Sequence, residues 1–411
     1  MPHTILLIGT LDTKGEELHF TRELIRARGH RVLLLDAGIL EEPRYPVDVG
    51  AGAVAEAGGS TLAALRAQGD RGVALEVMAR GAAVLAVQLQ SQGRIDGVLA
   101  LGGSCGTAIG TAAMRALPVG LPKVMVSTVA SGQVGPYVGL KDVTMMYAVV
   151  DIAGLNRISR RILANAAGAM CGMLEQDVPP GDDRPVIAAT MFGVTTPCVE
   201  RVRKHLEAAG YEVLVFHATG SGGRAMEGLI DAGFIAGVAD VTTTEWCDEL
   251  VGGVLTAGPE RLDAAARAGI PQVVSVGALD MVNFGPRETI PDKFRDRHFH
   301  VHNPSVTLMR TTAAENARLG EIIAGKLNRA TGPVTMLLPL RGVSALDRSG
   351  QAFFDAKADA ALFDALRRSL DSSKVALLEL DLHINDPEFA DAIAERLLTQ
   401  MQTRVHAVHS A

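Results

Sequence analysis

Hydrophobic positions form short continuous runs that alternate with longer amphipathic segments. Residues 5–8 and 31–36 are apolar runs, and residues 14–28 between them have helical periodicity. Continuous apolar runs are typical of parallel strands that helices cover on both faces. The alternation therefore predicts an α/β protein built on parallel sheets.

The pattern continues until a polar, proline-containing segment at residues 177–183, which we interpret as a linker. This segment divides the 411 residues into two predicted domains, 1–180 and 181–411, in keeping with the chain length. The further elements expected in the first domain are helix 73–91, strand 95–101, helix 108–116, strand 123–127 and helix 155–175.

The segment after the linker resembles the first one. Residues 28–37 read RGHRVLLLDA and residues 209–218 read AGYEVLVFHA. Two further pairs match, 95–98 with 235–238 and 120–124 with 269–273. We predict two Rossmann-like, doubly wound parallel-sheet subdomains related by internal duplication, with chance similarity of common α/β residues as the alternative. The second domain is extended by strand 334–338, helix 355–370, strand 375–380 and a terminal helix from Asp386.

Composition narrows the class of protein. Hydrophobic residues make up 48% of the chain, which allows a substantial core. The net charge is −7 and there is no long basic run, so we expect no nucleic-acid partner. The four cysteines form no C-x-x-C pair, and neither a signal peptide nor an apolar run of ~18 residues is found. We therefore expect a cytoplasmic protein that does not enter membranes.

The strongest local motif is the glycine-rich turn 101–107, LGGSCGT, between a strand and a helix. Glycines let the backbone approach a ligand, and the amides at a helix N-terminus favour anions. The predicted contacts are Gly102, Gly103, Ser104, Gly106 and Thr107, with Ser127 at the end of the next strand. A tight turn that only permits close packing is the alternative. The motif is neither G-x-G-x-x-G nor a P-loop, and Cys105 is the weaker candidate as a nucleophile.

A second turn, residues 9–15, follows the first strand. Lys14 is suited to neutralising phosphate, and Asp12 to holding Mg²⁺ through water, with Thr13 between them. An Asp/Thr helix cap is the alternative reading.

The second domain contains a comparable turn. Arg224 at the start of the helix is suited to bidentate binding of phosphate or carboxylate, and a flexible turn with a solvated arginine is the alternative. The predicted second-ligand residues of this turn are Thr219, Gly220, Ser221, Gly222, Gly223 and Arg224.

Other strand ends of the second domain also carry polar residues. Thr243, Thr244 and Glu245 occupy the position of the first-domain glycine turn, where they either bind an anion or cap a helix. Thr195, Thr196, Asp280 and Asn283 complete the predicted second-ligand set, and turn formation is the alternative for the last two.

Three histidines, His298, His300 and His302, stand at alternate positions. On a strand they share one face, which allows a metal site. A solvent-facing or hydrogen-bonded row is the commoner arrangement, so a metal-dependent enzyme is one alternative function.

Taken together, the motifs resemble those of one family. They are GTLDTK at 9–14, GGSCGT at 102–107, MFGVTTP at 191–197, FHATG at 216–220 and GALDMVNFG at 277–285. They are similar to motifs of the family of the tomato mosaic virus resistance protein, which includes stand-alone bacterial members of unassigned activity. The resemblance covers nearly the whole chain, although Cys105 stands where glycine is expected in many relatives.

The resemblance implies an ATP-binding module of two Rossmann-like subdomains that forms dimers; the plant relative blocks viral RNA replication by binding the viral replicase. It makes ATP with Mg²⁺ the expected cofactors and a homodimer or higher homo-oligomer the expected assembly. We therefore expect an ATP-binding protein, with an enzyme that uses ATP on a small carboxylate or sugar acid between the halves as the first hypothesis. A non-catalytic, nucleotide-regulated module acting through protein partners is the alternative.

Overall fold

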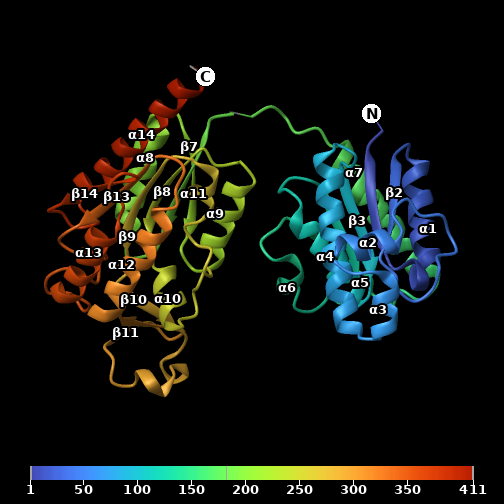
Figure 1. The fold of residues 1–411 in the computed structure, drawn as a ribbon, viewed down its shortest axis with the longest axis horizontal. Helices are drawn as coiled ribbons and strands as arrows, with labels where there is room; N and C mark the ends of the chain where they lie inside the picture. Colours follow the sequence, from blue (N-terminus) through green and yellow to red (C-terminus); the bar gives the residue numbers. More distant parts are fainter. Residues whose placement is uncertain (1, 182, 410–411) are drawn as a thin grey trace. The chain divides into compact units, whose positions relative to one another are not determined.

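The computed structural model describes residues 2–181 and 183–409, and the chain divides into two compact units, residues 1–180 (unit 1) and 181–411 (unit 2). Each unit contains a parallel sheet with helices on both faces (Figure 1). The predicted fold class is confirmed.

In unit 1 the sheet has five parallel strands in the order β2-β1-β3-β4-β5. The strands are β1 (Thr4–Gly9), β2 (Arg31–Asp36), β3 (Gly97–Gly102), β4 (Lys123–Ser127) and β5 (Thr144–Tyr147). The helices are α1 (Leu11–Ala27), α2 (Ala51–Ala57), α3 (Leu62–Gln68), α4 (Arg71–Ser91), α5 (Ser104–Ala116), α6 (Gly135–Val138) and α7 (Arg157–Glu175).

Side chains of alternate strand residues pack into two separate hydrophobic cores, one on each face of the sheet. Leu6 and Ile8 of β1 pack with α2, α4 and α5 on one face. Ile5 and Leu7 pack with α1 and α7 on the other. Both faces are covered, which explains why the strands are continuously apolar.

By length and composition alone, α4 could cross a membrane. Its 21 residues nevertheless include the charged Glu76 and Arg80. Its residues Ala74, Met78, Ala82 and Ala86 are buried within the core of unit 1. One face of α4 therefore packs into the core of unit 1.

Unit 2 has a six-stranded parallel sheet in the order β14-β13-β9-β8-β6-β7. Its strands are β6 (Val186–Met191), β7 (Glu212–His217), β8 (Gly237–Thr242), β9 (Gln272–Gly277), β13 (Val334–Pro339) and β14 (Val375–Leu380). Helices α8 (Thr196–Ala208) and α14 (Pro387–His409) cover one face. The other face is covered by α9 (Ser221–Asp231), α10 (Glu245–Val251), α11 (Ala264–Ala268), α12 (Ala313–Leu327) and α13 (Ala356–Ser369).

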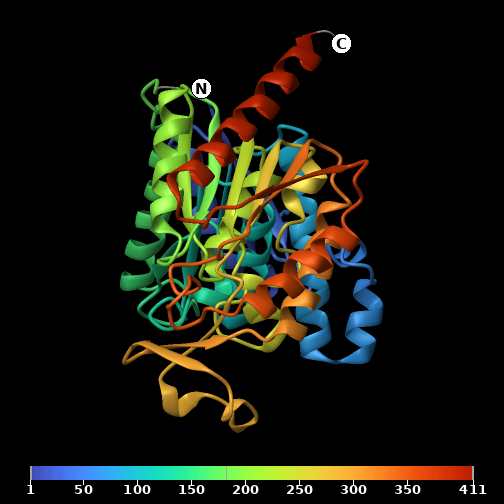
Figure 2. The ribbon, with the colours of Figure 1, turned by 90° about the vertical axis from the view of Figure 1, so that its left-hand side faces the viewer.

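One segment of unit 2 departs from the predicted parallel pattern. After β9 the chain forms an antiparallel sheet in the order β10-β12-β11, which lies at one end of the unit (Figure 2). Its strands are β10 (Met281–Phe284), β11 (Phe299–Asn303) and β12 (Val306–Arg310), with short 3-10 helices at Arg287–Thr289 and Asp292–Phe294. These strands are too short to have a distinctive periodicity, and they interrupt the otherwise parallel pattern.

The order of the first four strands is the same in both units. In each unit the first strand lies between the second and the third, with the fourth beside the third. This agreement supports internal duplication. In such sheets ligands bind at the switch point, outside the carboxyl ends of the first and third strands. The switch points are therefore β1/β3 in unit 1 and β6/β8 in unit 2.

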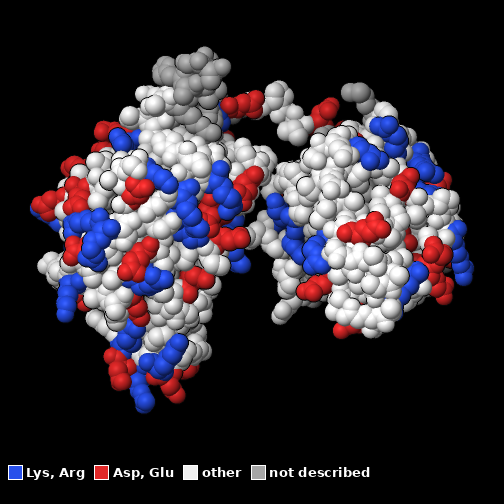
Figure 3. Space-filling view, viewed as in Figure 1, with Lys and Arg blue, Asp and Glu red and all other residues white. Residues whose placement is uncertain are grey.

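Positive and negative side chains are mixed on the face of the molecule that Figure 3 presents. Figure 3 shows Lys and Arg interspersed with Asp and Glu on both units in the face that it presents, with no extended patch of one sign.

Candidate functional site

The glycine turn of unit 1 lies at its switch point, at the end of β3. Helix α5 begins at Ser104, earlier than the predicted 108, so most of the motif forms the first helical turn. Within the described part of the chain no side chain caps this helix, and Ser104 is exposed. The first amides of α5 therefore remain available to an anion.

Two glycines of this turn have different roles. A Cβ on Gly102 would lie 2.7 Å from the Gly106 Cα, so glycine is required there for close packing of the strand end against the helix. A Cβ on Gly103 would meet only the Thr128 Oγ1, at 3.7 Å. Close packing thus explains Gly102, while Gly103 borders an open position.

Thr107 and Ser127 lie beneath the turn. Both side chains are fully buried and their hydroxyl oxygens are 2.7 Å apart. The Val129 N–H donates to the Ser127 Oγ at 3.1 Å. These two predicted contact residues connect the turn to the end of β4 and offer no exposed hydroxyl.

Arg71, which the sequence analysis did not single out, lies beside the turn. It is the first residue of α4, exposed, and its Nη2 is 3.3 Å from the Cys105 Sγ. A guanidinium at this position adds a full positive charge to the helix N-terminus. No local signal identifies Arg71, because the contact depends on the packing of α4 against α5.

The turn after β1 has a different environment. Lys14 has non-helical backbone angles, and its Nζ donates to the Ile152 carbonyl. The amide of Leu11, at the start of α1, donates to Asp36 Oδ1 at 2.9 Å, so this helix start already has an anion from the chain itself. Burial raises the pKa of Asp36.

Asp12 accepts the Leu40 N–H at 2.9 Å through Oδ2, while its buried Oδ1 has no partner among the described residues. Thr13 Oγ1 is 2.8 Å from Thr10 Oγ1. Asp12 and Thr13 line a cavity of about 290 Å³ whose charged lining also includes Glu16, Glu17, Glu41, Glu42 and one basic residue, Arg44. An acidic cavity suits a cation better than a free phosphate, so Asp12 fits the predicted Mg²⁺ role better than Lys14 fits phosphate.

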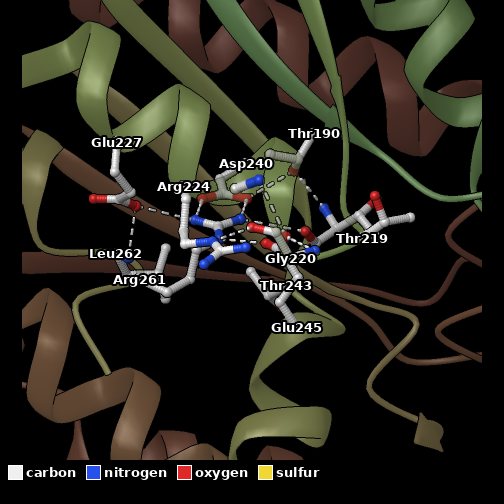
Figure 4. A network of polar contacts seen from close by, with 12 residues as sticks. Thr190, Thr219, Gly220, Arg224, Glu227, Asp240, Thr243, Glu245, Arg261 and Leu262 are labelled. Carbon is white, nitrogen blue, oxygen red and sulfur yellow. Dashed lines mark hydrogen bonds and ion pairs between the residues drawn. The ribbon is translucent and has the colours of Figure 1, made fainter. Parts of the chain in front are cut away.

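In unit 2 the glycine turn already binds a carboxylate of the chain. The Gly220 and Gly223 N–H groups donate to Glu245 Oε1 at 2.7 and 3.1 Å, at the start of α9. Figure 4 shows Glu245 against this turn, with Arg261 between three carboxylates. Glu245, predicted as a ligand contact, thus takes the place of the ligand.

Arg261 is the centre of this network and is 1% exposed. It binds Asp240 through two bonds of 2.6 and 2.7 Å, and its Nε donates to Glu245 at 2.7 Å. Glu227 is 3.3 Å away and also accepts the Leu262 N–H, at 2.7 Å. Burial raises the pKa of Glu227, while Arg261 opposes that shift. An isolated arginine in a loop has no sequence pattern that predicts this role.

Threonines fill the β6/β8 switch point of unit 2. Thr195 and Thr242 are fully buried, with their hydroxyls 2.8 Å apart. Thr243 donates to the Ser275 carbonyl at 3.1 Å, and Thr244 to that of Met281 at 3.4 Å. These hydroxyls satisfy main-chain and side-chain partners and face no opening.

The remaining residues of the predicted second-ligand set are dispersed. Thr196 donates to main-chain carbonyls of its own turn, and Thr219 to the His217 carbonyl at 3.3 Å. Ser221 is exposed, and a Cβ on Gly222 would lie 1.9 Å from the His217 oxygen, so close packing requires that glycine.

Asp280 and Asn283 belong to two separate buried clusters. Asp280 accepts the Ser344 hydroxyl at 2.7 Å near Arg310, Asp347 and Asp359. Burial, together with the Asp347 charge, raises the pKa of Asp280 to about 7 and that of Asp359 to about 8.

Asn283 instead donates to Asp248 Oδ2 at 2.7 Å. Burial raises the pKa of Asp248 to about 7. Both predicted residues are completely inaccessible to solvent, so neither faces a ligand directly.

The histidine row gains no support as a metal site. His300 and His302 lie on β11 and His298 directly precedes it, and the rings of His298 and His300 lie near Phe353. Among the described residues no group of three or more His, Cys, Asp or Glu side chains is arranged to hold a metal ion.

Comparisons with known proteins match the two units separately. The N-terminal domain of an uncharacterised protein family, UPF0261, matches residues 3–179, and the C-terminal domain of the same family matches residues 184–401. A UPF0261 protein of Clostridium tetani is 51% identical over 98% of this chain and its own full length. The tomato ToMV resistance protein Tm-1(GCR237) is 46% identical over 80% of this chain. The matched region makes up 44% of the tomato protein.

Among solved structures, the similarity is distant. The glycosyltransferase SsfS6 of Streptomyces sp. SF2575 covers 100% of both chains at 13% identity and a TM-score of 0.18. The UDP-N-acetylglucosamine 2-epimerase of Rickettsia bellii covers 99% of this chain and 98% of its own, at 10% identity and a TM-score of 0.21.

Proposed function

This chain belongs to the UPF0261 family, and we propose that it is an ATP-binding protein whose phosphate site is the start of α5 in unit 1. The observation that carries the proposal is the pairing of uncapped amides at Ser104–Gly106 with the guanidinium of Arg71. Both features favour an anion, and they lie at the switch point where open α/β sheets bind ligands.

The contrast with other helix starts supports this choice. The start of α1 is bonded to Asp36 and that of α9 to Glu245, so both already have an anion from the chain itself. Helix α5 has thirteen residues, long enough for a developed dipole at its N-terminus.

In this proposal Mg²⁺ is held by nucleotide phosphates, water and one carboxylate, and Asp12 is the candidate carboxylate because its Oδ1 has no partner among the described residues. The proposed reaction is the use of ATP on a small carboxylate or sugar acid. The non-catalytic alternative differs in one measurable respect, since it predicts nucleotide binding without turnover in any substrate screen.

Thermal denaturation with ATP, with and without Mg²⁺, tests the proposal. ATP at about 100 times its Kd stabilises the binding unit by about 2.7 kcal/mol. Gly103→Asp places a carboxylate at the open position and is expected to abolish the shift. Gly103→Ala is the matched control, because its Cβ makes an ordinary contact. Arg71→Ala is expected to weaken binding about tenfold or more.

Two results contradict the proposal. One is the absence of any shift at millimolar ATP in the unaltered protein. The other is an unchanged shift in a folded Gly103→Asp variant, which would place the nucleotide elsewhere.

A further inference from the structure

Unit 2 has a cavity of about 510 Å³ between α9 and residues 257–261. Its size falls in the range of small-molecule sites. It lies beside the buried Arg261 network, on the face of the sheet that α9 covers. One wall of the cavity consists of apolar side chains and main chain, from Ala257, Gly258 and Pro259. The charge of a ligand that fits is therefore determined by the charged side chains around this wall.

Two acidic residues of this cavity have hydrogen-bond or ion-pair partners within the chain. Glu227 accepts the Leu262 and Ala264 N–H groups, both at 2.7 Å, and pairs with Arg261 at 3.3 Å. Asp231 is bound by Arg267 at 2.8 Å. The third, Glu260, is exposed, as is Arg224, so water screens both charges.

The two arginines of the cavity differ. Arg261 is saturated by Asp240, Glu245 and Glu227. Arg224 donates only its Nε, to the Gly220 carbonyl at 3.2 Å. That bond orients the side chain, and its two terminal nitrogens have no acceptor among the described residues.

From this arrangement we propose that the cavity binds a small organic anion, with the terminal nitrogens of Arg224 holding its carboxylate or phosphate group. A planar guanidinium matches either group through two parallel hydrogen bonds. The proposed site lies within unit 2 and is independent of the proposed nucleotide site.

Calorimetric titration of the full chain with succinate, glycerate and inorganic phosphate tests the site and separates the two anionic groups. We expect millimolar or tighter binding of at least one probe. Arg224→Gln should weaken it about tenfold or more, and Arg224→Lys should restore part of the loss because the charge remains without the planar fork. Arg201→Gln is the matched control, since Arg201 is exposed and lies on α8, on the opposite face of the sheet.

Absence of binding by all three probes, or equal affinities of the Arg224→Gln variant and the unaltered protein, overturns the proposal. The nucleotide site is tested separately in the same variants. Arg224→Gln should leave ATP binding unchanged, and Gly103→Asp should leave anion binding in unit 2 unchanged. Failure of one site therefore does not count against the other.

Discussion

Helices α5 of unit 1 and α9 of unit 2 both begin in glycine-rich turns, yet their amides have different environments. The amides of α5 have no side-chain cap within the described chain, and Arg71 lies nearby. The amides of α9 donate to Glu245, which Arg261 holds in place. A glycine turn before a helix thus predicts affinity for an anion, but not whether that anion is a ligand or a side chain of the same protein.

The switch points show the same difference. In unit 1 Gly103, directly after β3, borders open space, whereas in unit 2 the corresponding positions hold the buried Thr242 and Thr243. The two units therefore differ in the polar groups that their own chain places at the switch point. The proposed ligand site of unit 2 accordingly lies beside α9 and not at its switch point.

Removal of Arg261 is expected to break the unit 2 arrangement most strongly. Arg261→Met leaves Asp240 and Glu245 buried without their cation, which should destabilise unit 2 by about 3–5 kcal/mol. Thermal or urea denaturation measures the loss. Arg267→Met, which removes an exposed ion pair, serves as the control and should cost about 1 kcal/mol or less. Equal effects would show that the network does not stabilise the unit.

Glu245→Ala tests whether the α9 turn is a true anion site with an internal occupant. The variant should lose about 3 kcal/mol, because the Gly220 and Gly223 amides and Arg261 lose an acceptor. Phosphate should then stabilise the variant more than it stabilises the unaltered protein. Glu245→Gln keeps an oxygen at the turn and should show no such gain. A phosphate effect equal in all three proteins would contradict this interpretation.

The two glycines of the unit 1 turn separate packing from binding. Gly102→Ala forces a Cβ against Gly106 and should destabilise unit 1 by about 1–3 kcal/mol. Gly103→Ala should change stability by about 0.5 kcal/mol or less. Denaturation curves of the two variants check the difference, and the reverse order would show that the turn has another conformation in solution.

Unit 2 stability is also expected to depend on pH. The pKa values of Asp280 and Asp359 in the folded protein, about 7 and about 8, lie above the ordinary carboxyl value of 3.8. Between pH about 4 and pH about 8 the folded state therefore binds more protons at these two carboxyl groups than the unfolded state does. The free energy of unfolding falls as pH rises through this range. We expect a melting temperature several degrees lower at pH 8 than at pH 5.

Asp280→Asn should flatten this dependence, because the amide stays neutral at every pH. Asp381→Asn, an exposed position, is the control and should leave the slope unchanged. A melting temperature that rises toward pH 8 in the unaltered protein would contradict the proposed protonation of the cluster.

Much of the parallel framework followed from local patterns. The bounds of β2, β4 and β14 agree with prediction, since their apolar runs end at polar or turn residues. Helix starts were less accurate, because the glycines and hydroxyl residues of 102–107 read as a loop although α5 begins at Ser104. The antiparallel sheet at 281–310 was not predicted because its strands have only four or five residues and because β10 pairs with β12 across 23 to 29 residues of chain, although β11 and β12 form a local hairpin.

By itself, the sequence determined the α/β class, the parallel strands and the positions of the glycine turns, because periodicity and turn chemistry act over a few residues. Tertiary structure alone decided what each turn faces. Arg71 lies 34 residues from Cys105, and Glu245 lies 25 residues from Gly220. Charge and hydrogen-bonding capacity are local properties of a residue, but whether an amide is left open or satisfied depends on which distant side chain the packing brings to it.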